Sequence, residues 1–361
     1  MKVALHIGQL LQPVPGGIAR YARALAKELP RHGIDVEAFA AGPRPKSING
    51  AYTDLGWPNG SIRYEAWNRF RWPTVKVPGD LVHAPSLAVP PVRNRPLVVT
   101  AHDIAFHRFP NTTTARGRAF HERGLAHARK HATLVIAPSQ FTQYELYSLG
   151  FRADQVDTAY LGTDPVEPMS DSEVDRRLAA VEQHRPFLLT VGTVEPRKRL
   201  PLLVKAHQQV RSQLPNLELL IVGPSGWGDV GVLEAPGVRR MGQLPWTVID
   251  ALYRRALACA IPSVYEGFGL PAVEAMSRGC PTVVVRGSAT EEIVGAGGLR
   301  VPADDPEALA EALHSLIFDA GRRDRVSRAG IERSRAFTWS TSVQRHAVLY
   351  RHVLQRHAQT G

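Results

Sequence analysis

Two glutamates flank a glycine-containing loop in the second half of the chain. Glu266 and Glu274 are separated by seven residues, and Gly267 and Gly269 lie between them. Pro271 suits the first turn of a helix, because its missing N–H would have no partner there. The loop would then lie at a helix N-terminus, where unpaired backbone N–H groups and the helix dipole can bind a phosphate.

The elements that would position this loop are two buried strands. Ala258–Ile261 and Pro281–Val285 are short apolar runs of the kind that buried parallel strands show. Gly279 suits the position just after the intervening helix. Loops after such strands bind ligands in doubly wound sheets, so we expect both glutamates at that edge, with Glu274 in the first helical turn. Alternatively, Glu274 only complements the helix dipole and Glu266 is a solvated loop acid.

A second glycine turn carries two basic residues. Phe187–Val191 is predicted as a strand, Gly192 and Thr193 follow it, and Arg197 and Lys198 come four residues later. An arginine fork and a lysine point charge that face the ligand edge can together neutralise a diphosphate.

The first half of the chain repeats the pattern of strand, turn and helix. Lys2–Ile7 is predicted as a strand, a loop ends in Pro15, Gly16 and Gly17, and a helical pattern covers Ile18–Leu29. This is the first unit of a doubly wound sheet. The glycines do not form a G-x-G-x-x-G fingerprint, so they alone are weak evidence for a phosphate loop. Residues 41–62 are rich in Gly, Pro, Asn and Ser and are predicted as a loop.

Histidines occur at two places that could carry chemistry. The predicted strand Leu97–Ala101 would deliver His102 and Asp103 to the ligand edge, although a lone histidine there is as often a structural hydrogen-bonding group. His127 and His131 lie one helical turn apart, which is a metal-ligand spacing. No third ligand accompanies them, so the sequence predicts no metal site.

These segments, taken in order, resemble a known enzyme family. The stretch YEGFGLPAVEAMSRGCPTVV resembles the E-x7-E signature of retaining, nucleotide-sugar-dependent glycosyltransferases of family 4, which have the GT-B fold. GGIARYARAL, VVTAHD, GTVEPRK and VRRMGQL resemble further segments of that family. The resemblance implies two doubly wound Rossmann-like α/β domains facing a cleft, the second holding mainly the donor and the first mainly the acceptor.

The resemblance also implies a role for each matched residue. Arg197 and Lys198 would stabilise charge on the donor's β-phosphate. Glu266 and His102 would orient the transferred sugar and complete the catalytic set, and Glu274 would bind the ribose hydroxyls. Further donor-binding positions would be Gly192, Thr193, Gln243, Leu244, Gly267, Phe268, Gly269 and Leu270. The acceptor or diphosphate side would include Gly16, Gly17, Arg20 and Asp103.

One position departs from the family pattern. An arginine commonly follows the glycine of the phosphate turn, whereas Thr193 follows Gly192 here, and whether Arg197 takes over that work stays open. The E-P-R-K turn and the H-D segment look most like mannosyltransferase members, so we expect GDP-mannose as co-substrate. The sequence has no D-x-D triplet, which fits chemistry without a metal or other cofactor.

Length and composition set outer limits. A chain of 361 residues predicts two domains, which we place at 1–165 on the acceptor side and 166–337 on the donor side, with 338–361 as a helix crossing back. Two cysteines near predicted core strands indicate a reducing compartment. No run approaches the roughly 18 apolar residues of a membrane span, and we expect a cytoplasmic protein.

The net charge of +11 is concentrated in the first half, where residues 1–164 carry 20 basic and 12 acidic side chains. A basic segment with tryptophans can bind an anionic membrane, although aromatic residues more often pack in a core or line an acceptor cleft. We expect a glycan or lipid-linked acceptor, with the protein peripheral on the inner face of the plasma membrane. The segment contains Arg63, Trp67, Arg69, Phe70, Arg71 and Trp72.

Other functions stay open at this point. A sugar-nucleotide epimerase shares the fold but needs acid and base groups near C2 and no acceptor cleft. A non-catalytic sugar-nucleotide-binding relative would be expected to have lost Lys198, Glu266 or Glu274. A nucleic-acid-binding protein would need a recognisable binding module, which the sequence lacks, so we expect no nucleic acid partner.

Overall fold

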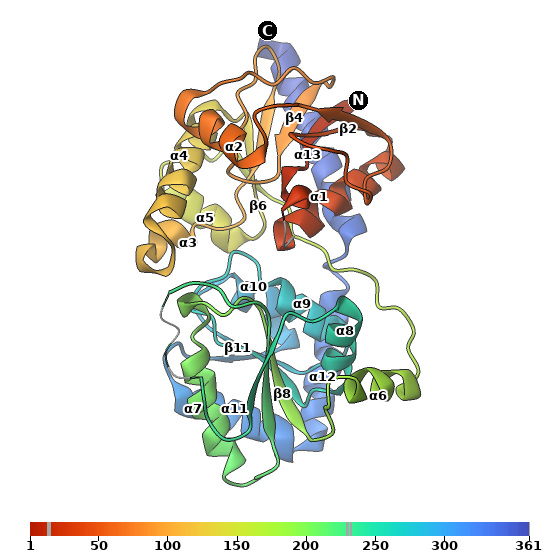
Figure 1. The fold of residues 1–361 in the computed structure, drawn as a ribbon, viewed down its shortest axis with the longest axis vertical. Coiled ribbons are helices and arrows are strands. Elements are labelled where there is room, and N and C mark those ends of the chain that lie inside the picture. The colour runs from red at the N-terminus through yellow and green to blue at the C-terminus, as the bar shows by residue number, and fades with distance from the viewer. Residues whose placement is uncertain (13–15, 229–230, 232, 361) are drawn as a thin grey trace. The chain divides into compact units, whose positions relative to one another are not determined.

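The computed structural model describes residues 1–12, 16–228, 231 and 233–360 (Figure 1). The chain divides into two compact units. Unit 1 contains Met1–Gly162 and Thr338–Gly361, and unit 2 contains Thr163–Phe337. Each unit is built on one parallel sheet with helices, so the predicted architecture of two doubly wound domains is confirmed.

The sheet of unit 1 has the strand order β3-β2-β1-β4-β5-β6-β7, and every neighbouring pair is parallel. The central strands are almost fully buried, as expected for a parallel sheet covered on both faces. The strands are β1 (Lys2–His6), β2 (Asp35–Ala40), β3 (Ala51–Asp54), β4 (Leu81–Ala84), β5 (Leu97–Thr100), β6 (Leu134–Ala137) and β7 (Val156–Thr158).

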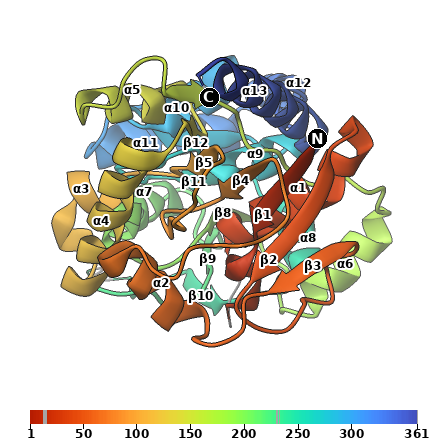
Figure 2. The same cartoon turned by 90° about the horizontal axis from the view of Figure 1, so that it is seen from above.

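Helices from both ends of the chain cover this sheet. The last helix, α13 (Trp339–Thr360), belongs to unit 1 and packs against α1 (Gly17–Glu28), as Figures 1 and 2 show. The other α-helices of the unit are α2 (Gly60–Phe70), α3 (Ala105–Arg108), α4 (Ala115–His131) and α5 (Gln140–Ser148). Short 3-10 turns are η1 (Gly8–Leu11), η2 (Leu29–His32) and η3 (Pro110–Thr112).

The sheet of unit 2 has the order β10-β9-β8-β11-β12-β13 and is also parallel throughout. Its register is set by apolar residues such as Leu188, which pairs with Leu219 on one side and Ala258 on the other. The strands are β8 (Phe187–Val191), β9 (Glu218–Val222), β10 (Val238–Gly242), β11 (Ala258–Ile261), β12 (Thr282–Val285) and β13 (Leu299–Val301).

One face of this sheet is covered by two helices that supply much of the apolar core, α7 (Leu200–Arg211) and α11 (Pro306–Phe318). Leu203 and Leu313 from these helices are fully buried. The remaining helices of unit 2 are α6 (Asp171–Ala179), α8 (Trp246–Arg255), α9 (Leu270–Ser277), α10 (Ala289–Val294) and α12 (Ala320–Ser334), with 3-10 turns η4 (Pro196–Lys198) and η5 (Gly295–Gly297).

The stretch predicted as a loop, residues 41–62, is the main correction to the predicted elements. It contains strand β3, and α2 begins at Gly60. Strand β3 forms the edge of its sheet and has no fully buried residue, so it lacks the apolar pattern by which strands are recognised.

The aromatic and basic segment in α2 also differs from the expectation. Trp67 is fully buried and its indole N–H donates to the Pro73 carbonyl at 3.1 Å. Arg63 is 5% exposed and donates to carbonyls of the preceding loop, including that of Leu55 at 2.8 Å. Phe70 and Trp72 are exposed, so the surface motif is smaller than predicted. In the described residues, no helix is both long and apolar enough to cross a bilayer.

Candidate active site

The turns after the central strands of unit 2 lie at one edge of its sheet, because parallel strands end on the same side. The turns after β8 and β9 touch each other. A Cβ atom on Gly223 would lie 2.0 Å from the carbonyl oxygen of Gly192, so this approach requires a glycine. The contact holds the predicted phosphate turn against the sheet.

An ion cluster lies at this edge and contains three of the four predicted catalytic residues. Glu266 accepts from the Lys198 ammonium at 2.5 Å with one carboxylate oxygen and from the Arg197 guanidinium at 3.0 Å with the other. Arg197 also pairs with Glu195 and donates to the Tyr265 carbonyl at 2.8 Å. Residues 68 or 69 apart in the sequence are thereby brought together.

The electrostatics of this cluster favour the ionised form of Glu266. Burial alone would raise the pKa of Glu266, but the positive charges of Lys198 and Arg197 outweigh it and lower that pKa to about 2. Two cations therefore face two carboxylates, those of Glu266 and Glu195, in a largely buried site. A diphosphate that entered this edge would find charged donors already desolvated and oriented.

The glycine loop and α9 have the predicted arrangement. Gly269 adopts a left-handed φ of 96°, and a Cβ atom there would lie 2.4 Å from a methyl carbon of Thr290. The helix begins at the next residue, Leu270, and Pro271 lies in its first turn. Phe268 is buried and its ring packs edge-on against Phe337, with centroids 5.7 Å apart.

The position of Glu274 in α9 differs slightly from the prediction. The first turn of α9 contains no acidic residue, so Glu274 lies just beyond it rather than within it. Its side chain is buried and accepts a hydrogen bond from the Tyr253 hydroxyl at 3.2 Å. Tyr253 is a residue that the sequence analysis missed, because no local pattern links a tyrosine on α8 to a glutamate 21 residues away.

Other predicted donor positions lie at the ends of strands in the same unit. Gly192 and Thr193 follow β8 and are partly exposed. A Cβ atom on Gly192 would lie 3.4 Å from the Lys198 nitrogen, so this turn lies beside the ion cluster. Gln243 is exposed and Leu244 is partly exposed, both just after β10 at the edge of the sheet.

In unit 1, His102 follows β5 and is held by a backbone contact. Its Nε2 lies 3.0 Å from the Pro85 carbonyl, which can only accept, so Nε2 carries the proton of this bond. Burial lowers the pKa of His102 to about 4, so the ring is neutral at neutral pH and its Nδ1 is an acceptor. Asp103 accepts from the backbone N–H of Ala105 at 3.0 Å, at the start of α3.

The remaining predicted residues lie at the start of α1. Gly16 and Gly17 are exposed, and the Gly16 carbonyl accepts from the backbone N–H groups of Ala19 and Arg20. Arg20 is partly exposed on the helix. Pro15 lies outside the described residues.

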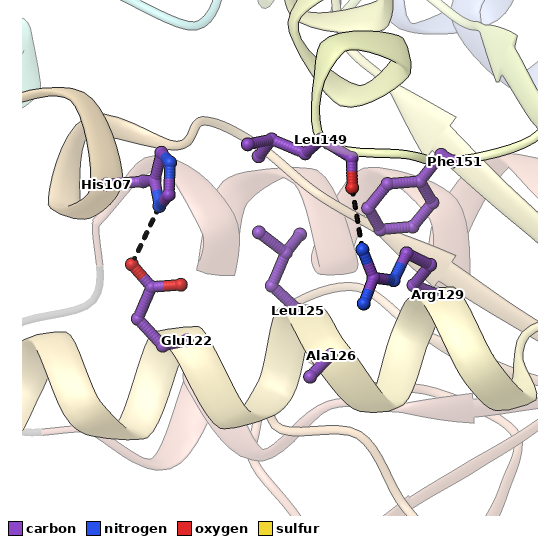
Figure 3. Close-up of a pocket in the computed structure, with 7 residues that line it drawn as sticks. All are labelled: His107, Glu122, Leu125, Ala126, Arg129, Leu149 and Phe151. Atoms are coloured by element: carbon purple, nitrogen blue, oxygen red, sulfur yellow. Dashed lines mark hydrogen bonds and ion pairs between the residues drawn. The ribbon is translucent and has the colours of Figure 1, made fainter.

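A small pocket of about 140 Å³ lies among α3, α4 and the turn after α5 in unit 1 (Figure 3). Leu125, Leu149 and Phe151 form much of its wall. Its polar groups already bond within the protein: His107 pairs with Glu122, and Arg129 donates to the Leu149 carbonyl. The pocket lacks the paired cations that a diphosphate would require.

In the part of the chain that the structure describes, no group of three or more His, Cys, Asp or Glu side chains could hold a metal ion. His127 instead bonds through Nε2 to the Asn68 carbonyl at 2.9 Å.

Two family models match the chain. The model "Glycosyltransferase Family 4" matches residues 15–167, and the model "Glycosyl transferases group 1" matches residues 185–319. The O-antigen chain mannosyltransferase B of Escherichia coli is 29% identical over 276 residues, which is 72% of this chain and 71% of that protein. The D-inositol 3-phosphate glycosyltransferase of Corynebacterium glutamicum (strain R) is 25% identical over 96% of this chain and 95% of its own length.

Solved structures share the fold over nearly the whole chain. Sucrose-phosphate synthase from Thermosynechococcus elongatus has a TM-score of 0.75 at 23% identity, covering 99% of this chain and 100% of that one. HepE of Anabaena, solved in complex with UDP and glucose, has a TM-score of 0.73 at 20% identity, covering 97% and 99%. The comparisons favour neither the epimerase nor the non-catalytic alternative.

Proposed function

Because this chain is a nucleotide-sugar-dependent glycosyltransferase of the family 4, GT-B type, we propose that it transfers mannose from GDP-mannose to a hydroxyl group, with retention at the anomeric carbon. The acceptor in this proposal is a glycan or a lipid-linked sugar.

The observation that carries the proposal is the ion cluster of Glu266, Lys198 and Arg197 at the carboxyl edge of the unit 2 sheet. Transfer breaks the bond between the anomeric carbon and a β-phosphate oxygen, and the electron pair stays on the diphosphate. Cations fixed beside that oxygen stabilise the transition state more than the ground state, because negative charge develops there. The N-terminus of α9 adds backbone N–H groups to the same site.

The remaining roles follow the chemistry of each side chain. The carboxylate of Glu274 can accept hydrogen bonds from both ribose hydroxyls. A neutral His102 can accept from a sugar hydroxyl through Nδ1, whereas a charged one could not. In this proposal the acceptor oxygen attacks the anomeric carbon on the face that the diphosphate leaves, and its proton passes to the departing phosphate. No step requires a metal ion.

Two observations support mannose as the transferred sugar. The E. coli relative is a mannosyltransferase, and the phosphate turn Glu195-Pro196-Arg197-Lys198 has the form expected of mannosyltransferases. Thermal unfolding with GDP, UDP and ADP, each added alone, tests the choice of nucleotide. We expect GDP to raise the midpoint most, because binding to the folded state alone stabilises it. Stabilisation by UDP alone would overturn GDP-mannose as the donor.

We also propose that the acceptor is presented at the anionic inner face of the plasma membrane. Phe70 and Trp72 are 72% and 62% exposed, and Arg69 lies beside the Phe70 ring at 5.8 Å. The neighbouring helix α4 adds exposed basic side chains, including Arg116, Arg118, Arg129 and Lys130. Exposed aromatic and basic groups of this kind attach proteins reversibly to acidic lipid.

A further inference from the structure

A buried chain of hydrogen bonds runs through unit 1 from α13 to α1 and the sheet. Its five side chains are at most 1% exposed. Successive contacts are Tyr350 hydroxyl to His83 Nδ1 (2.7 Å), His83 Nε2 to Thr100 Oγ1 (2.8 Å), Thr100 Oγ1 to Tyr21 hydroxyl (2.8 Å), Tyr21 hydroxyl to His346 Nε2 (2.5 Å) and His346 Nδ1 to the Ser342 carbonyl (2.7 Å).

The direction of this chain is fixed from one end. The Ser342 carbonyl can only accept, so Nδ1 of His346 carries a proton. Burial lowers the pKa of His346 to about 4, so its ring is neutral and Nε2 is an acceptor. The Tyr21 hydroxyl must therefore donate to His346, and its oxygen is left to accept from the Thr100 hydroxyl.

The remaining bonds follow by the same count of protons. The Thr100 hydroxyl has one proton, which goes to Tyr21, so Thr100 must accept from Nε2–H of His83. Burial holds the pKa of His83 well below its usual value, so its Nδ1 is an acceptor and Tyr350 donates to it. The two histidines of this hydrogen-bond chain must therefore be opposite tautomers, with the proton on Nε2 of His83 and on Nδ1 of His346.

One member of this hydrogen-bond chain, Tyr21, also contacts a predicted site residue, His102. The Tyr21 ring meets the His102 ring edge-on, with centroids 5.0 Å apart and planes at 86°. Trp339, the first residue of α13, lies on Tyr21 as well, with centroids 6.5 Å apart. Because both the ring and the hydroxyl of Tyr21 are held, its ring forms a fixed wall for His102.

We propose that Tyr21 is a positioning residue, through which His346 on the C-terminal helix fixes the orientation of His102. This inference rests on the proposed role of His102 in holding the sugar. It gives α13 a part in the site beyond completing the core of unit 1, since a shift of that helix would move the His102 ring.

The tautomers are tested by long-range ¹H–¹⁵N correlation spectra of histidine-labelled full-length protein. We expect Nε2–H at His83 and Nδ1–H at His346. In Tyr21→Phe the Thr100 hydroxyl loses its acceptor and can turn to donate to His83, so His83 should gain Nδ1–H while His346 keeps its tautomer. If His83 and His346 had the same tautomer in the wild type, the assigned directions of these hydrogen bonds would be wrong.

The positioning role is tested without any turnover by the signals of His102. They should shift or broaden in Tyr21→Phe and His346→Leu, and His346→Gln should restore them in part, because its amide oxygen can accept from Tyr21. His352→Asn, an exposed histidine on the same helix, is the matched control and should leave them unchanged. His102 signals that stay unchanged in Tyr21→Phe would overturn the proposal.

Kinetics separate this inference from the proposed function. For GDP-mannose turnover we expect Tyr21→Phe to lower kcat about tenfold while the Kd for GDP stays within twofold, because the nucleotide is held by unit 2. An unchanged kcat in a folded Tyr21→Phe protein would also reject the inference. A wild-type protein without transferase activity would instead reject the proposed function, and the spectra would still decide the role of Tyr21.

Discussion

The two sheets of this protein hold their candidate residues with opposite electrostatics. At the edge of unit 2, Glu266 lies between Lys198 and Arg197, and all three are charged. In unit 1, His102 is neutral, and it lies beside a chain of neutral groups that includes Tyr21. Both arrangements follow parallel strands, so the difference comes from the side chains and not from the fold.

The difference suggests a division of work between the units. A diphosphate carries charge, and a desolvated cluster of ions can exchange one anion for another at little cost in reorganisation. A sugar carries hydroxyl groups, and neutral acceptors in fixed orientations suit them better.

The largest difference that we expect between the two units is in their stability at acidic pH. Burial lowers the pKa of His6 to about 3 and those of His102 and His346 to about 4, so these rings stay neutral while the unfolded chain takes up protons near pH 6.5. The stability of unit 1 is therefore fully present above about pH 6.5 and falls toward pH 4, by roughly 1.4 kcal/mol per pH unit for each histidine.

Unit 2 should lose less stability over this range, because among its described histidines burial lowers the pKa of His207 alone. The depressed pKa of Glu266 contributes stability that is present above about pH 4.5 and is lost as the pH falls toward 2. Hydrogen exchange on the intact chain at stepwise lower pH should show unit 1 opening first. Loss of protection in unit 2 before unit 1 would contradict the comparison. His6→Leu should reduce the loss of stability in acid, because it removes one buried group that takes up a proton on unfolding. It breaks no hydrogen bond, since neither His6 ring nitrogen has a partner among the described residues. His352→Asn should leave the loss unchanged.

The next effect concerns the charged edge. Lys198→Ala should lower transfer about 10²- to 10³-fold, because a preorganised donor to developing charge is worth about 2 to 4 kcal/mol of barrier. Steady-state rates with GDP-mannose measure it. Lys205→Ala, an exposed lysine on α7, is the control and should behave as wild type. Near-normal turnover in Lys198→Ala would mean that the ion cluster of unit 2 does not stabilise the transition state.

A smaller loss is expected at Glu274. Glu274→Ala removes hydrogen bonds to a charged acceptor, worth roughly 1.5 to 3 kcal/mol, so kcat/KM for the donor should fall about 10- to 100-fold. Tyr253→Phe removes only the hydroxyl that Glu274 accepts from and should cause a weaker loss in the same parameter. If neither variant changed the kinetics for the donor, Glu274 would be a structural residue of α9.

The smallest effect tests the surface of unit 1. Sedimentation with acidic and neutral vesicles should show binding to the acidic ones at low salt, with about 1 kcal/mol for each basic residue near the surface. Phe70→Ser with Trp72→Ser should weaken it, whereas Trp227→Ser in unit 2 should not. Equal binding to both vesicle types, or none at low salt, would favour a soluble acceptor.

The sequence predicted the elements around the glycine loop well because their signals are local. Buried apolar runs such as Ala258–Ile261 and Phe187–Val191 coincide with strands, and Pro271 and Gly279 mark the ends of α9. The exposed edge strand β3 was missed because an edge strand need not bury either face.

The contacts that complete the candidate sites were out of reach of sequence patterns. The bond between Tyr21 and His346 joins residues 325 apart, and the indole N–H of buried Trp67 bonds to the Pro73 carbonyl in the loop after α2. The spacing of aromatic and basic residues in α2 suggested a surface, yet Trp67 and Arg63 face inward. Such outcomes depend on tertiary packing and have no local signature.

Hydrogen exchange of the full chain with and without saturating GDP would show which of the two units binds the diphosphate. We expect protection to increase at residues 192–198 and 266–270 of unit 2 and to stay unchanged at residues 100–103 of unit 1, since GDP lacks the transferred sugar that His102 would hold. Bound GDP that protects residues 100–103 but leaves both turns of unit 2 unchanged would contradict this expectation.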